Sequence, residues 1–161
     1  MRSVLVTTAL WALSAAAAAG QDSPDRDAPH AIVARPEQVA WRAAPPVLPP
    51  GARLAVLEGD PARPGPFTMR IRLPDGYRIP PHYHPTVEHV TVLEGTFKVG
   101  MGQAFDSTAL QPLPAGTFAA LAPGVRHFAQ AEGATVLQLH GIGPWQLIYV
   151  DPDDDPRRTT P

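Results

Sequence analysis

The chain has 161 residues, with 13 lysines and arginines against 15 aspartates and glutamates, so its formal net charge is −2 at pH 7. Neither a basic patch nor an amphipathic basic helix stands out, which argues against binding to nucleic acid or to a membrane surface. The chain has no cysteine, so neither disulfides nor a cysteine-linked lipid anchor are expected. Its 21 prolines and 13 glycines separate short apolar runs, a pattern that predicts an all-β protein.

The first residues have the pattern of a secretory signal peptide. Arg2 supplies a positive charge, an apolar stretch follows, and the small residues Ala17–Ala19 suit cleavage. We therefore expect residues 1–19 to be removed on export and the mature protein to be periplasmic or secreted, with no attachment to the membrane. Residues 20–50 follow as a proline-rich arm, in which Gln38–Trp41 could form a short strand on the folded domain or on a neighbouring subunit.

An early strand is expected at Phe67–Leu73, where apolar and polar residues alternate. Only one face of this strand can look into the interior of the domain, which leaves two alternatives. Arg70 and Arg72 would bind a substrate carboxylate there, whereas Met69 and Ile71 would favour an apolar or aromatic ligand. Buried unpaired arginine is rare, and this favours the apolar face.

The next segment carries candidate metal ligands. His82 and His84 are separated by one residue, and residues i and i+2 of a strand point to the same face about 6.5–7 Å apart. Two such imidazoles can lean onto one ion at about 2.0–2.1 Å. Glu88 keeps that parity and can return its carboxylate to the same face, whereas His89 should point outward. With His127 from a later segment, three imidazoles and one carboxylate predict a transition-metal site.

The remaining strands are expected to be short and separated by turns. Glu88–Leu93 and Phe97–Met101 would be two strands joined by a turn at Leu93–Thr96. Residues 151–161 are first acidic and then basic, and we expect a disordered tail there. The other expected strands are, in chain order, Arg53–Leu57, Thr117–Leu121, Val125–Gln130, Thr135–His140 and Trp145–Val150.

Two segments of the chain resemble the paired motifs of the cupin superfamily. The first motif is matched at all its defining positions, which are Gly76, His82, His84, Glu88 and Gly95. The second motif is matched at Gly116, Gly124 and His127. Ala122 and Ala131 stand where that second motif expects proline and asparagine.

The resemblance implies a fold, a cofactor and a ligand set. The fold is a single cupin-type, jelly-roll-like antiparallel β-barrel over residues 51–150. The cofactor is one divalent transition metal per chain, and manganese, iron, copper, nickel and zinc all remain open. The metal ligands carried over from the motifs are His82, His84, Glu88 and His127.

Residues for a substrate pocket are less clearly indicated. Gln138 and His140 share one parity on a late strand, so they either line the cavity or face solvent. Together with Met69 they form the candidate pocket. No second carboxylate has inward parity near the ligands, which leaves Glu88, released from the metal, or His140 as the candidate acid–base catalyst.

Two functions fit these features. The resemblance favours a metal-dependent enzyme on a small organic substrate, either an oxidoreductase of the dioxygenase type or an isomerase, because cupins with this ligand set include both. The alternative is a non-catalytic module that binds a metal or a metabolite, which the missing acid–base pair favours. The strand edges of small barrels need covering, so a homodimer is expected.

Overall fold

The computed structural model describes residues 31–158 of the chain, and the compact unit Ile32–Pro161 contains the secondary structure found in that part. The expected signal peptide at residues 1–19 lies outside the described residues and stays a prediction. Across residues 31–158, no helix has both the length and the apolar character that a membrane span requires.

Residues 31–158 form nine β-strands in one antiparallel sheet and three short 3-10 helices, one before the first strand, one between the fifth and sixth strands and one after the last strand. The 3-10 helices are η1 (Pro36–Gln38), η2 (Ser107–Ala109) and η3 (Pro152–Asp154). The strands are β1 (Arg42–Ala43), β2 (Arg53–Glu58), β3 (Gly65–Leu73), β4 (Arg78–Tyr83), β5 (Glu88–Met101), β6 (Gln111–Pro114), β7 (Phe118–Leu121), β8 (His127–Gly143) and β9 (Ile148–Tyr149).

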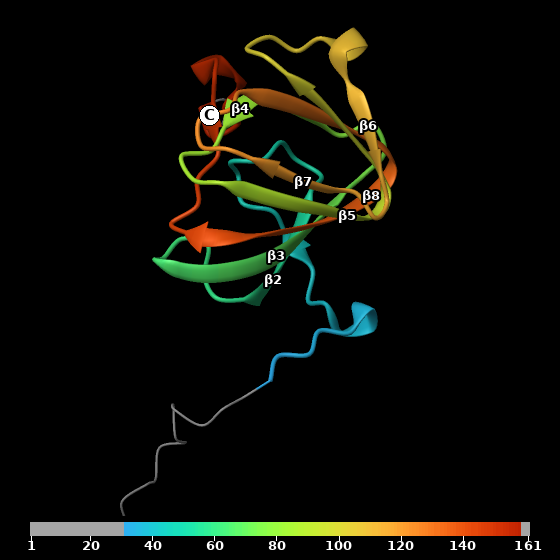
Figure 1. Cartoon of the computed structure of the whole chain (residues 1–161), viewed down its shortest axis with the longest axis vertical. Coiled ribbons are helices and arrows are strands. Elements are labelled where there is room, and N and C mark those ends of the chain that lie inside the picture. Colours follow the sequence, from blue (N-terminus) through green and yellow to red (C-terminus); the bar gives the residue numbers. More distant parts are fainter. Residues whose placement is uncertain (1–30, 159–161) are drawn as a thin grey trace, which may run out of the picture. The chain divides into compact units, whose positions relative to one another are not determined.

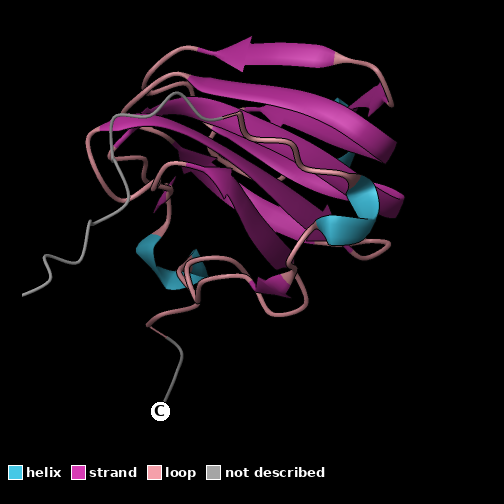
Figure 2. Cartoon of the chain, turned by 90° about the horizontal axis from the view of Figure 1, so that it is seen from below, coloured by secondary structure: helices cyan, strands magenta, loops and turns pink. Residues whose placement is uncertain are grey.

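The long strand β8 holds the sheet together. One half of it pairs with β3 and the other half with β4, while β5 pairs with it along most of its length. Figure 1 shows β5 and β8 in the middle of the molecule, with β2 and β3 below them and β6 above. Figure 2 shows the strands on several sides of the domain and the short helices outside them. The sheet curls into the jelly-roll-like antiparallel barrel that the sequence predicted.

Strand β3 shows why the sheet buries one face. Phe67, Met69, Ile71 and Leu73 alternate with more exposed residues, and their side chains are buried in the core. Such alternation follows from the two-residue period of a strand. The apolar face therefore looks inward, and the alternative in which the two arginines of this strand line the interior is wrong.

Both arginines of β3 find partners outside the core. Arg70 donates a hydrogen bond from Nε to Oε1 of Gln138 at 3.1 Å on the neighbouring strand β8. The guanidinium of Arg72 lies 4.5 Å from the centre of the Trp41 ring, a cation–π contact. Trp41 therefore anchors the proline-rich arm to the barrel, although Gln38–Trp41 is not the strand we expected. Helix η1 ends at Gln38, Val39–Trp41 form no regular element, and the pairing with β2 begins at Arg42.

Strand β5 is the main departure from the predicted elements. The expected turn at Leu93–Thr96 is instead an irregularity within one strand, marked by register shifts against β8. Gly95 has a φ of +73°, which glycine adopts without steric cost. Because the shift changes the parity of the strand, Val90 before it and Phe97 after it both face inward.

The late strands also differ from expectation. The expected strand Val125–Gln130 begins only at His127, and its remainder and Thr135–His140 belong to one strand, β8, because β5 pairs with both without a break long enough for a turn. The expected strand Trp145–Val150 is reduced to β9, since proline 144 precedes it and cannot donate to a ladder. Strand β6, which pairs with β5 at Thr96 to Val99, was missed because two of its four residues are proline.

The domain extends beyond its predicted limits of residues 51–150. In the arm, the Val47 carbonyl accepts a hydrogen bond of 2.7 Å from the Tyr149 hydroxyl, and Leu48 is buried in the core. In the tail, residues 151–158 form η3 and a turn in which Asp155 and Arg157 pair. The expectation of a disordered tail is therefore wrong for residues 151–158, while residues 159–161 lie outside the described part.

Candidate metal centre

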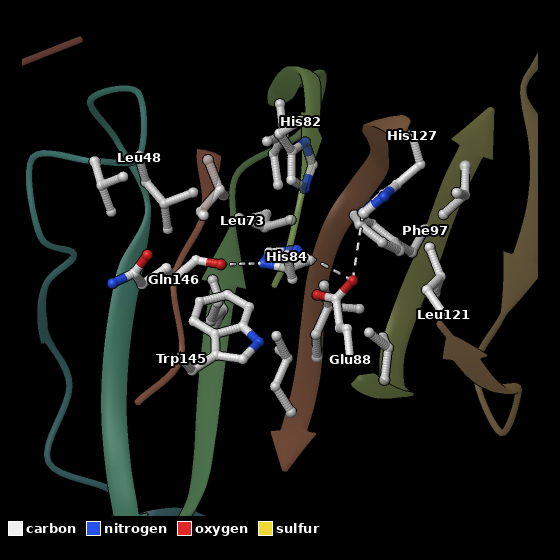
Figure 3. Close-up of a pocket in the computed structure, with 18 of the residues that line it drawn as sticks. Leu48, Leu73, His82, His84, Glu88, Phe97, Leu121, His127, Trp145 and Gln146 are labelled. Carbon is white, nitrogen blue, oxygen red and sulfur yellow. Dashed lines mark hydrogen bonds and ion pairs between the residues drawn. The ribbon is translucent and has the colours of Figure 1, made fainter. Parts of the chain in front are cut away.

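Three imidazoles converge on the inner face of the barrel. His82 lies in β4, His84 directly follows that strand, and His127 opens β8 directly opposite His82. Their candidate ligand atoms all lie within 4.8 Å of one another, and each of the three side chains is almost fully buried. Figure 3 shows the three rings pointing toward one another, with Glu88 beside His84 and His127.

Each imidazole is oriented by a backbone carbonyl. Nδ1 of His82 donates to the Pro80 carbonyl at 2.8 Å, and Nδ1 of His127 donates to the Val125 carbonyl at 3.0 Å. Nδ1 of His84 donates to the carbonyl of Gln146 at 2.7 Å. A carbonyl can only accept, so the proton of each neutral ring lies on Nδ1 and the lone pair lies on Nε2. Backbone carbonyls commonly orient metal-binding histidines in this way.

Glu88 completes the cluster from the first position of β5. Its Oε2 atom lies 3.4 Å from Nε2 of His84 and 3.3 Å from Nε2 of His127. Burial alone would raise the pKa of Glu88, but the two neighbouring imidazoles outweigh that effect and hold its pKa well below the usual range. The side chain is therefore a carboxylate and offers an anionic oxygen to the centre.

His82 is kept neutral by its surroundings. Burial is the largest cause, and the neighbouring His127 and His84 add to it, so the pKa of His82 is lowered to about 3. A neutral imidazole with its proton on Nδ1 presents the Nε2 lone pair, which is the form that binds a metal. The environment therefore holds this side chain ready as a ligand at neutral pH.

The donors of the cluster fit a cation. Nε2 of His84 is buried and has no hydrogen-bond partner. A buried polar atom of this kind destabilises the folded protein unless it binds a ligand. Three nitrogen lone pairs and a carboxylate oxygen also repel one another unless a positive charge lies between them. Imidazole and carboxylate together suit zinc and the first-row transition metals. The three buried histidines could thus form a metal site, with Glu88 as a fourth ligand.

The loop between β8 and β9 positions His84 in a way that the sequence did not reveal. The indole of Trp145 stacks on the His84 ring at 4.4 Å between ring centres and 19° between planes. The Gln146 carbonyl receives the Nδ1 hydrogen bond of the same ring. The stacking contact and the hydrogen bond together fix the orientation of the His84 ring. Gly143–Pro144 was a local signal that β8 ends before Trp145, but nothing in the sequence connects that loop to His84.

The cluster opens onto a cavity of about 820 Å³. Its walls are largely apolar, and Met69 is among the residues that line it. Gln138 and His140 do not line it, although their neighbours Leu137 and Leu139 do. The parity of β8 therefore points both candidate residues to the outer face, and the alternative that placed them in the substrate pocket is wrong.

His140 belongs to a separate outer cluster. Its ring stacks on that of His89 at 4.9 Å and 10°, and the Phe118 ring lies beside both, 6.0 Å from His89 and 6.5 Å from His140. His89 thus points outward, as its parity predicted. Because His140 faces away from the metal ligands, it is also excluded as the acid–base catalyst of the inner site.

The turn before His127 forms without the proline that the second motif expects. Val125 donates a backbone hydrogen bond to Ala122 at 3.2 Å, and Gly124 donates one to the His84 carbonyl at 2.9 Å. The second contact links the two ligand-bearing segments directly. Ala131, at the position expected to be asparagine, is held through its backbone by Tyr77 and Gly76.

Comparison with known protein families agrees with this geometry. A family model described as the ChrR cupin-like domain matches residues 29–146. The chain belongs to the ChrR cupin-like domain family. The match includes both ligand-bearing segments of this cupin and most of the proline-rich arm. A search of curated proteins found no match.

Solved structures share the fold of this cupin at low sequence identity. A polyketide cyclase, RemF from Streptomyces resistomycificus, has a TM-score of 0.60 and 16% identity, covering 77% of this chain and 88% of that chain. A candidate acetylacetone dioxygenase from Methylibium petroleiphilum has a TM-score of 0.58 and 21% identity, covering 77% and 83%. An RmlC-like cupin from Ralstonia eutropha has a TM-score of 0.57 and 19% identity, covering 75% and 73%.

Proposed function

We propose that this cupin is an exported metal-dependent enzyme that acts on a small organic substrate, by oxidoreductase chemistry of the dioxygenase type or by isomerisation. One observation carries the proposal. Three imidazole Nε2 atoms and the Glu88 carboxylate converge, buried, at the wall of a cavity of about 820 Å³. Donors that served only to hold the fold together would not need a cavity of that size beside them.

His82, His84, His127 and Glu88 would hold the metal, which we take to be manganese, iron, copper, nickel or zinc. When bound, such an ion supplies Lewis-acid chemistry that polarises a carbonyl or an enolate, and a redox-active ion adds chemistry with dioxygen. The carbonyl partners of the three Nδ1 atoms keep the imidazoles in the ligating tautomer. Their geometry is thus set before any ligand arrives, which lowers the cost of ordering the site.

The protein's own contribution to proton transfer would come from Glu88. Among the described residues that line the cavity, it is the only carboxylate. As a carboxylate, Glu88 could accept a proton once released from the metal but could not donate one at neutral pH. The apolar walls would exclude water from the reacting groups and strengthen electrostatic interactions there.

Export and assembly complete the proposal. The signal-peptide pattern at residues 1–19 favours a periplasmic or secreted protein, which would collect its metal after leaving the cytoplasm. Homodimer formation would cover exposed strand edges such as those of β1 and β6. A mature N-terminus at residue 20 or 21 in the exported fraction, and a molar mass twice that of one chain, would support these two points.

A non-catalytic module is the second candidate. It is favoured by the absence of any further carboxylate among the described residues of the cavity wall, because many acid–base mechanisms need two such groups. In that case the cupin would hold a metal or a metabolite without catalysing a reaction. The fold is compatible with both functions.

Metal content and turnover, measured together, separate the two candidates. The mature protein would be purified from its native compartment, analysed for bound elements, and incubated with a panel of small carbonyl compounds while oxygen uptake and products are followed. His82→Ala removes a proposed ligand, and His140→Ala is the matched control on the outer face. Turnover lost only in His82→Ala supports the enzyme, whereas bound metal without turnover supports the module. An absence of metal in the unaltered protein contradicts the enzyme and leaves a module that binds a metabolite.

A further inference from the structure

We infer that the cavity selects an apolar substrate that carries a single oxygen-donor head group, and that it discriminates against sugars and dicarboxylates. The head group would lie at the four candidate ligands and the hydrocarbon body would fill the rest of the cavity. The placement of the head group rests on the proposed function. The preference for an apolar body rests on the walls alone.

The walls of the cavity come from strands on several sides of the barrel. Most of them are aliphatic and aromatic side chains that are buried in the core, and Gln111 and Gln146 are the two neutral amide side chains among the described lining residues. Burying a hydroxyl or a carboxylate against such a surface without a hydrogen-bond partner costs free energy. A polyhydroxylated ligand would therefore lose more by leaving water than it gains. Representative wall residues are Met69, Ile71, Val90, Phe97, Val99 and Leu139.

The charges around the cavity disfavour a second anionic group. Arg157 is the only lysine or arginine among the described lining residues. Its Nε atom donates to both carboxylate oxygens of Asp155, at 2.8 and 3.1 Å, and its side chain is 52% exposed. Asp155 thus neutralises this guanidinium, which cannot compensate a buried carboxylate without giving up that pair. A divalent ion, the Glu88 carboxylate and one anionic head group would together be neutral, so no positive charge would remain for a second carboxylate.

A flat apolar surface lies next to the candidate ligands. Trp145 lines the cavity, and its indole stacks on the His84 ring with 4.4 Å between the ring centres. Figure 3 shows Trp145 and Glu88 on different sides of His84, so the indole leaves the carboxylate side open. Aromatic surfaces stack favourably on planar apolar groups. A ring or an extended enol beside the head group would match this wall.

The test compares ligands of one shape and different charge. Isothermal titration calorimetry would measure binding of 2-naphthoate, 2-naphthol and 2,6-naphthalenedicarboxylate, with gluconate as a polar monoanion, to the metal-loaded mature protein. We expect 2-naphthoate to bind at least about 10-fold more tightly than the dicarboxylate, and gluconate to bind weakest. Equal or tighter binding of the dicarboxylate or of gluconate would overturn the inference.

Variants show whether binding occurs in this cavity. Leu113→Asp places a charge on the cavity wall at a partly exposed position, and it should weaken 2-naphthol binding at least about 10-fold. Leu93→Asp, an exposed position outside the cavity, is the matched control and should change binding less than 2-fold. If Leu113→Asp lowers the melting temperature too far for measurement, Ala119→Phe fills the same cavity and should weaken binding similarly. Unchanged binding in a folded cavity variant would refute the inference.

Failure of the inference can be distinguished from failure of the proposed function. The protein freed of metal by a chelator should bind neutral 2-naphthol within about 3-fold of the metal-loaded protein, because the apolar walls do not change. That result would support the apolar preference whether or not the protein proves to be an enzyme. Loss of 2-naphthol binding in the folded, metal-free protein would contradict our view that the walls select the ligand body.

Discussion

Two groups of histidines lie on opposite faces of the sheet, and they differ in their hydrogen-bond partners and in what surrounds them. The inner group is His82, His84 and His127, and the outer pair is His89 and His140. Strand β8 begins with an inner histidine and carries an outer one near its end. Strand β5 places Glu88 inward and His89 outward at successive positions.

The inner group is oriented as a set of ligands and the outer pair is not. Every inner ring has its Nδ1 atom hydrogen-bonded to a backbone carbonyl, which turns Nε2 toward a shared centre that includes a carboxylate. The outer rings stack face to face with Phe118 nearby, and Nδ1 of His89 is buried without a partner. Strand parity and backbone carbonyls, and not histidine content, therefore define the candidate metal centre.

Removal of an inner ligand should have the largest effect. His82→Ala takes away one of four donors and leaves three that cannot close around the ion. Changing a residue that merely orients a ligand typically costs 10- to 100-fold in metal affinity, so we expect a loss of more than about 100-fold here. Competition with a chelator of known affinity measures this directly. If His82→Ala kept its metal affinity, the inner histidines would not be metal ligands and would not differ from the outer pair in this respect.

The glycine at the irregularity of β5 should come next, because it sets which residues of the strand face inward. A Cβ atom on Gly95 would lie 2.5 Å from the carbonyl oxygen of Ala134. Gly76 has a similar φ of +70° but nothing within 4 Å of such an atom. Both alanine variants pay about 1–2 kcal/mol for the left-handed backbone, and Gly95→Ala should lose about 1–3 kcal/mol more through overpacking.

Urea denaturation of the two glycine variants checks that difference. The midpoint of Gly95→Ala should lie below that of Gly76→Ala at unchanged slope. Equal midpoints would mean that the backbone of β8 at Ala134 moves away from the new methyl group without loss of stability. The irregularity of β5 would then not be fixed by steric exclusion at Gly95.

A smaller effect is expected at Trp145, which contacts the inner group without being a ligand. Stacking of this kind contributes about 0.5–1.5 kcal/mol, so Trp145→Ala should lower metal affinity roughly 2- to 10-fold. Trp145→Phe keeps an aromatic face and should restore most of the loss. An unchanged affinity in Trp145→Ala would show that the Gln146 carbonyl alone orients His84.

The smallest effect is expected from the outer pair. His140→Ala removes a partly exposed ring from a stack on the outer face, so metal affinity should stay within about 2-fold and the free energy of unfolding should fall by less than about 1 kcal/mol. Calorimetric unfolding and chelator competition on the same sample provide both values. A marked loss of metal in this variant would mean that the two faces are coupled through β8.

Sequence reasoning identified the inner group because the relevant information is local. The spacing of His82 and His84 on one strand, and the parity of Glu88 and His89, follow from the two-residue period. The carbonyl partners of His82 and His127 also lie only two residues away along the chain. Alternation likewise predicted the inward face of β3.

The parts that escaped prediction depend on distant contacts. The carbonyl that accepts the hydrogen bond of His84 lies 62 residues away, in a loop whose sequence predicts a strand. The parity of β5 beyond Gly95 depends on a register shift against β8, which a turn-like Leu-Glu-Gly-Thr sequence does not reveal. Val47 and Arg157 line the cavity from segments that look like a linker and a tail. For such residues the tertiary contacts, and not local preference, decide the structure.

Anomalous diffraction from crystals of the metal-loaded protein tests the central claim most directly. Data collected above and below the absorption edge of the bound metal locate the ion without assumptions about its ligands. Our account predicts one peak per chain between Nε2 of His82, His84 and His127, with a Glu88 carboxylate oxygen in contact. A peak between His89 and His140, or none at the inner group of a metal-loaded crystal, would contradict it.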